Sequence, residues 1–124
     1  MGLLDGIMGN ASEIDANEVQ QELGDVLNAN EQVTAAYKLI RDMLVITNKR
    51  LMFIDKQGVT GKKVSYRSIP YKSVTQFSVE TAGRFDTDSE LKVWISGQKE
   101  PLMLDLKSNL AASVQRSLAD MMFQ

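Results

Sequence analysis

Residues 43–55 read MLVITNKRLMFID, and this stretch decides the fold that the sequence predicts. Two short runs, rich in branched and aromatic side chains, flank the polar stretch 47–50. Asn48 tolerates the backbone conformations of tight turns, so the pattern predicts a β-hairpin. Both runs are apolar at nearly every position, so both faces of this hairpin must be partly covered by other parts of the chain.

Further short runs with period-two alternation lie on both sides of the hairpin. A polar loop over 82–90 separates two of them, and Pro70 and Pro101 stand at strand ends, where a missing N–H is tolerated. We expect these strands at 35–41, 64–70, 74–81, 91–95 and 101–106. With the hairpin they make seven short strands without intervening helices, which predicts an antiparallel meander, economical as a partly open barrel.

Helical spacing of apolar residues is found at both ends of the chain. Ser12 is the expected N-cap of a helix that reaches residue 28, and Ser108 can cap a final helix that plugs the barrel. A length of 124 residues fits one domain. The expected parts are an N-terminal helical segment over 1–28, a β core over 31–107 and a capping helix over 108–124.

Three segments, in this order, carry a resemblance that covers essentially the whole chain. They are LVITNKRLMFID (44–55), YRSIPYKSVTQFSVE (66–80) and GRFDTDSELKVWI (83–95). Followed by one helix, they resemble the bacterial pleckstrin-homology (PH) domain family. The resemblance implies a mainly β PH fold, in which two nearly orthogonal antiparallel sheets of seven strands are closed by a C-terminal helix. It also implies a cyclic homo-oligomer, with a pentamer expected for a single-domain member.

The composition excludes several kinds of chemistry. The chain has no cysteine and no histidine, which removes thiolate nucleophiles, Cys/His zinc sites and every Ser-His or Cys-His pair. The carboxylates Asp86, Asp88 and Glu90 alternate, but the glycine and the distal glutamate of a calcium loop are absent. We therefore expect neither an enzyme, nor a metal site, nor a cofactor.

The net charge of −2 conceals an uneven distribution. Residues 1–30 hold six acidic and no basic residues, whereas residues 31–80 hold nine basic and four acidic residues, a local charge of +5. We hypothesise that the acidic N-terminal segment packs near the basic strands, either of its own subunit or of a neighbour.

The function that fits these features is a protein–protein interaction module, which assembles into a homo-oligomeric ring and displays a polar surface to a second, unidentified protein. The polar residues predicted to form that surface are Tyr66, Arg67, Arg84, Asp86, Asp88 and Glu90. The apolar residues predicted to contact a neighbouring subunit are Leu3, Leu4, Ile7 and Met8.

The alternative is a peripheral membrane module that binds phospholipid headgroups. The pairs Lys49-Arg50 and Lys62-Lys63 supply cations, but they lie in different turns, and the short junction at Asp42 opposes a phosphate by its charge. A sequence pI near 5.1 disfavours nucleic acid. The N-terminus lacks the basic region of a secretion signal, and no apolar run is long enough to span a membrane, so we expect a cytoplasmic protein.

Overall fold

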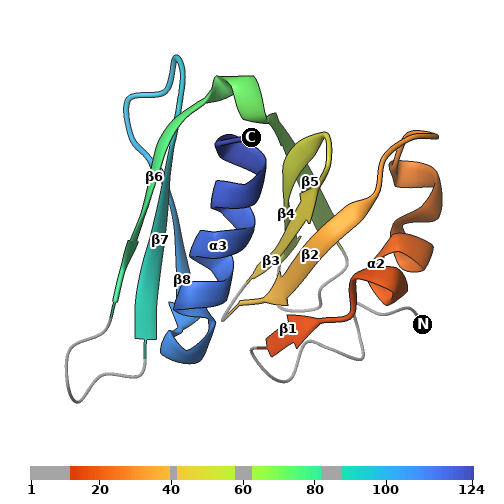
Figure 1. The fold of residues 1–124 in the computed structure, drawn as a ribbon, viewed down its shortest axis with the longest axis horizontal. Helices are drawn as coiled ribbons and strands as arrows, with labels where there is room; N and C mark the ends of the chain where they lie inside the picture. Colours follow the sequence, from red (N-terminus) through yellow and green to blue (C-terminus); the bar gives the residue numbers. More distant parts are fainter. Residues whose placement is uncertain (1–11, 40–41, 58–62, 82–87) are drawn as a thin grey trace.

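The computed structural model describes residues 12–39, 42–57, 63–81 and 88–124, which form two antiparallel sheets with a helix at each end of the chain (Figure 1). The five-stranded sheet has the order β1-β2-β3-β4-β5, and the three-stranded sheet has the order β6-β7-β8. The predicted class, a mainly β fold with a C-terminal helix, is confirmed. The strands are β1 (Ser12–Ile14), β2 (Val33–Lys38), β3 (Asp42–Thr47), β4 (Arg50–Gln57), β5 (Lys63–Pro70), β6 (Val74–Glu80), β7 (Asp88–Ile95) and β8 (Leu102–Lys107).

The described residues therefore contain eight strands rather than the seven predicted, because the N-terminal segment is not one continuous helix. Its first three residues form β1, which pairs with β2, and α2 begins only at Ala16 and ends at Leu23. Asp15 caps α2 in place of Ser12, since its Oδ1 accepts the Asn17 N–H at 2.8 Å. Three residues are too few to show a period of two, so only the pairing with β2 reveals this strand.

The end of α2 is marked by Gly24, whose φ of 27° lies in the region that favours glycine. A 3-10 turn (Gly24–Val26) follows and leads the chain toward β2.

Two other predicted boundaries were wrong. Strand β7 starts at Asp88, three residues before the expected position, because residues 88–90 pair with β8 across the sheet. Ser108 does not cap the final helix: it begins a 3-10 turn (Ser108–Leu110), and α3 (Ala111–Met122) follows without a side-chain cap.

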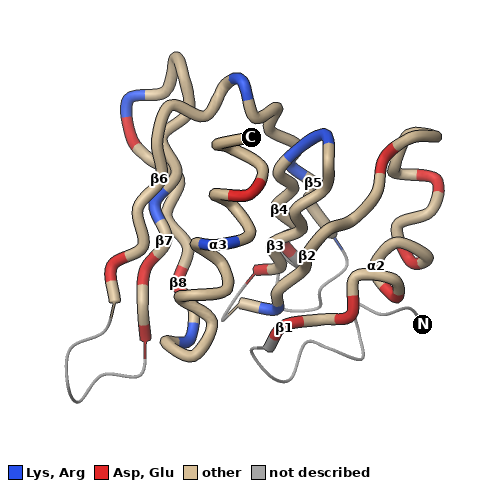
Figure 2. Tube along the Cα trace, viewed as in Figure 1, with Lys and Arg blue, Asp and Glu red and all other residues tan. Residues whose placement is uncertain are grey.

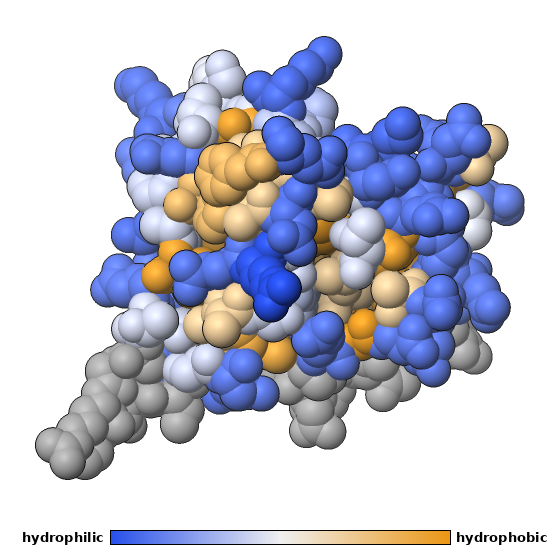
Figure 3. Space-filling view, in the orientation of Figure 1, coloured by the Kyte–Doolittle hydropathy of each residue, from blue (hydrophilic) through white to orange (hydrophobic). Residues whose placement is uncertain are grey.

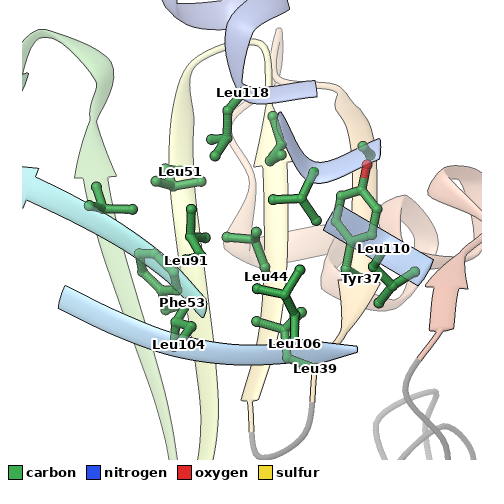
Figure 4. Packing of buried hydrophobic residues seen from close by; sticks show 14 of the residues in the cluster. Tyr37, Leu39, Leu44, Leu51, Phe53, Leu91, Leu104, Leu106, Leu110 and Leu118 are labelled. Carbon is green, nitrogen blue, oxygen red and sulfur yellow. The ribbon is translucent and has the colours of Figure 1, made fainter. Parts of the chain in front are cut away.

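The main core lies between the two sheets and beneath α3 (Figure 4). The inner side chains of both sheets meet Leu110, Val114 and Leu118, which form the predicted stripe of the last helix. Tyr37 ties this helix to β2: its hydroxyl lies 2.7 Å from Ser117 Oγ and donates to the Ser113 carbonyl at 3.0 Å. The helix thus plugs one opening between the sheets, as the sequence predicts.

A second core covers the outer face of the five-stranded sheet. Val19 and Leu23 of α2 pack there against Ala36, Val45 and Met52. This contact explains why the central hairpin is apolar on both faces. The acidic residues of α2 remain exposed (Figure 2), so apolar packing rather than charge attraction holds this helix on the sheet.

Candidate functional site

The inner face of the five-stranded sheet changes from apolar to charged along β3, β4 and β5. Residues directly opposite one another form rows across these strands. From the core outward, the rows are Ile46–Leu51–Ile69, Leu44–Phe53–Arg67 and Asp42–Asp55–Ser65. The first row is buried, whereas both aspartates and Ser65 of the last row are only half-buried. The core therefore ends where these charges begin.

A cavity of about 280 Å³ lies between this charged end and strand β8. One wall carries Asp42, Asp55 and Ser65, with Arg67 beside them, and Phe53 adds an apolar ring. The opposite wall is residues 102–104 of β8. Because β8 pairs with β7 alone, this strand presents an open edge beside the cavity. The cavity thus joins an apolar surface to a small group of charges.

The charges in this cavity leave it with a net charge of −1, from two carboxylates and one guanidinium. Asp42 and Asp55 stand directly opposite each other on neighbouring strands, a position where like charges repel. Arg67 is diagonal to Asp55, but within the described ranges no ion pair or hydrogen bond joins the two side chains. The cavity therefore has an excess of negative charge that Arg67 does not neutralise by direct contact.

At the opposite end of the same hairpin, the Glu31 carboxylate is enclosed by four hydrogen-bond donors. Arg50 donates from Nε at 2.8 Å and from Nη2 at 2.9 Å, Thr47 Oγ1 donates at 2.6 Å, and the Asn28 N–H donates at 3.2 Å. Burial alone would raise the pKa of Glu31, but the hydrogen bonds from Arg50, Thr47 and Asn28 outweigh it and lower this pKa. This network is complete in itself and leaves no group for a ligand.

Two cations considered for lipid binding are used inside the protein. Arg50, expected to be solvated in an exposed turn, instead binds Glu31 and the Val26 carbonyl. The side chain of Lys38 is buried, and its Nζ donates to the Leu39 carbonyl at 2.6 Å. Burial lowers the pKa of Lys38, although the nearby charge of Asp42 opposes this shift. Neither cation is therefore presented to a headgroup.

The residues predicted to form one polar surface lie on different faces where the structure describes them. Tyr66 is exposed on the α2 side of β5, whereas the neighbouring Arg67 faces the cavity, because successive side chains of a strand alternate. On β7 of the other sheet, Asp88 pairs with Lys107 at 3.0 Å and Glu90 with Lys92 at 3.6 Å. The predicted positions outside the described residues are Arg84, Asp86, Leu3, Leu4, Ile7 and Met8.

Sequence reasoning missed the cavity, although a signal for it was present. A two-residue turn at 48–49 places residues whose numbers add to 97 opposite each other, so the hairpin alone puts Asp42 across from Asp55. That β8 forms the opposite wall could not be seen in the same way, because it depends on how the two sheets cross.

An exposed apolar surface covers the C-terminal end of α3 beside β6 (Figure 3). Phe123 is 73% exposed, and its ring stacks on Phe77 of β6 with 6.1 Å between the centroids. Met121 and Met122 are half-buried against the main core. Large exposed aromatic groups of this kind are typical of protein contact surfaces.

The comparisons with known proteins agree with this architecture. A family model described as "Bacterial PH domain" matches residues 2–122. The chain belongs to the bacterial PH domain family. The predicted resemblance is confirmed over nearly the whole sequence.

Three relatives show how widely this PH domain is shared. A solved protein with a PH domain from Shewanella loihica PV-4 superposes with a TM-score of 0.81 at 57% identity, covering 92% of this chain and 98% of its own. A PH domain from Shewanella amazonensis SB2B gives a TM-score of 0.79 at 52% identity, covering 89% of this chain and 100% of its own. "Uncharacterized protein YjqA" of Bacillus subtilis is 59% identical over 101 residues, which is 82% of this chain and 81% of that protein.

Proposed function

We propose that this bacterial PH domain protein is a non-enzymatic protein-interaction module that assembles into a cyclic, five-membered homo-oligomer. The observation that carries the proposal is the exposed Phe123 ring stacked on Phe77. Covering this apolar surface with a neighbouring subunit would remove it from water, which is the main favourable term in protein association.

A closed ring needs two different patches on each subunit, because every interface joins one patch to the other. The Phe77–Phe123 surface supplies the first patch. The apolar residues near the N-terminus, Leu3, Leu4, Ile7 and Met8, are the proposed second patch. A ring then repeats one binding surface several times, which raises the effective concentration of weak contacts with a partner protein.

Binding of a phospholipid headgroup is the less favoured function. Arg50 is occupied by Glu31, and Lys38 is buried, so two of the available cations are withdrawn from the surface. In the described ranges, none of the helices has the length and apolar character that crossing a bilayer requires.

The test measures the molar mass of the whole protein in solution by light scattering. We expect a multiple of the 13.8 kDa protomer mass, and a lower mass for Phe123→Ser. Val26→Ser is the matched control, because Val26 is a 43% exposed apolar residue outside the proposed patch. A protomer mass for the wild-type protein, or an unchanged mass for Phe123→Ser, would contradict the assembly proposed here.

A further inference from the structure

We propose that the cavity between the β3–β5 end of the first sheet and strand β8 binds a long cationic side chain, arginine or lysine, of a partner protein. The inference deepens the interaction function proposed above, on which it rests, by naming the chemistry of the partner. It is independent of ring formation, since the cavity lies within one chain.

The carboxylates at the end of the cavity suit the charged head of such a side chain. Asp42 and Asp55 stand directly opposite each other on neighbouring strands, where Cβ atoms lie about 5 Å apart. A guanidinium carries five donors in a planar fork, and an ammonium carries three, so either can bridge two carboxylates. A cation placed there also relieves the repulsion between the two aspartates.

The remaining lining suits the apolar stem of the same side chain. Phe53, Leu102 and Leu104 provide hydrocarbon surface between the carboxylates and β8. Lysine and arginine characteristically lay their methylene stems on apolar surface while the head reaches a polar site. A volume of about 280 Å³ is at the lower end of ligand pockets, so it fits one such side chain rather than a large cofactor.

The backbone that carries the cation also has a place to bind. Strand β8 has no neighbour on its open side, and Met103 at that edge is 57% exposed. An extended partner segment can lie along this rim and use hydrogen-bonding groups that no other strand occupies. Arg67, exposed beside the cavity, adds donors for carbonyl oxygens of the segment.

Two other ligands fit less well. A bare metal ion would be repelled by Arg67, and no group of three or more potential metal-binding side chains occurs in the described part of the chain. A phosphate would have to sit against two carboxylates with a single arginine to offset them. The pattern of two acids, one base and an apolar wall favours an organic cation attached to a peptide.

The test titrates the isotope-labelled whole protein with N-acetyl-arginine amide and follows backbone amide signals by NMR. We expect shifts confined to the cavity lining around residues 42, 53–55, 65–67 and 102–104. The neutral analogue N-acetyl-citrulline amide has nearly the same shape, and we expect it to bind about tenfold more weakly, because one charge-assisted interaction is lost.

Two variants with the same change of charge sharpen this test. Asp55→Asn removes a carboxylate from the cavity and should weaken arginine binding about tenfold. Asp105→Asn, on the exposed face of β8, should leave it unchanged. The proposal is overturned if arginine shifts no cavity signals, if citrulline binds as well, if Asp55→Asn binds normally, or if Ca²⁺ or inorganic phosphate produces the same shifts more strongly.

The outcomes separate this inference from the assembly proposal. An oligomeric wild-type protein whose cavity ignores arginine keeps the ring and removes the cation site. A protein of protomer mass whose cavity binds arginine does the reverse.

Discussion

At the turn of the β3–β4 hairpin the Glu31 carboxylate is enclosed by four donors, whereas at the other end Asp42 and Asp55 face a cavity that Arg67 only borders. Both regions combine carboxylates with an arginine from neighbouring strands. They differ in whether the protein itself supplies the opposite charge at hydrogen-bonding distance.

This difference indicates different roles. A buried carboxylate is tolerated when all its lone pairs are satisfied, and the Glu31–Arg50 pair thereby ties residues 26–31 to the hairpin. Charges that face a cavity without such a partner contribute little to folding and are available for an external group. The comparison therefore separates a structural ion pair from a candidate binding site, and four measurements test it.

The largest expected effect is from Glu31→Ala. Removing this carboxylate leaves the Arg50 guanidinium without its main partner, so the free energy of unfolding should fall by about 3 kcal/mol in a urea titration. Glu22→Ala, at an exposed position of α2, should change it by less than about 0.5 kcal/mol. Equal effects of the two substitutions would remove the structural role assigned to Glu31.

A smaller loss is expected for Thr47→Val. The Thr47 hydroxyl donates to Glu31 and accepts the N–H groups of Lys49 and Arg50. Replacing it by a methyl group of similar volume should cost about 2 kcal/mol of unfolding free energy. Thr81→Val, at an exposed position, is the control, and a Thr47→Val protein as stable as this control would show that the network does not depend on the hydroxyl.

Acidification should weaken the same network. The pKa of Glu31 is lower in the folded protein than its ordinary value of 4.5, so the unfolded state binds the proton more readily. The stabilisation is complete above the unfolded pKa and is lost as the pH falls through the lower folded pKa. Unfolding free energies measured from pH 6 downward should therefore decline less steeply in Glu31→Gln than in the wild type; parallel declines would exclude Glu31 as the titrating group.

The smallest effect on stability is expected for Asp55→Asn. This substitution keeps the shape of the side chain and removes its repulsion with Asp42, so the free energy of unfolding should stay constant or rise by about 0.5 kcal/mol. Thermal unfolding checks this directly. A clear loss of stability would mean that Asp55 has a structural partner, and the contrast with Glu31 would disappear.

Much of the fold could be predicted because it rests on local periodicity. The alternation within 43–55 and its two-residue turn give the strands, and even their register, without any tertiary information. The final helix was predicted from the stripe of Leu110, Val114 and Leu118. The start of α2 was placed too early because a three-residue strand has no recognisable period.

The candidate site was predicted less well, since its members come from separate parts of the chain. Arg67 was selected for its exposure and motif, but its orientation toward the cavity follows from its register opposite Phe53. Arg50 was assigned to solvent because Glu31, nineteen residues away, gave no sign of being its partner.

The sequence by itself determined the succession of strands, the central hairpin, the final helix and the membership of the bacterial PH family, because each depends on residue types at short, regular spacings. Only the tertiary structure decided that β1 joins the sheet, that Glu31 is satisfied by Arg50, and that the two aspartates open into a cavity against β8. These features depend on how distant segments pack, and packing selects among arrangements that local patterns leave equally acceptable.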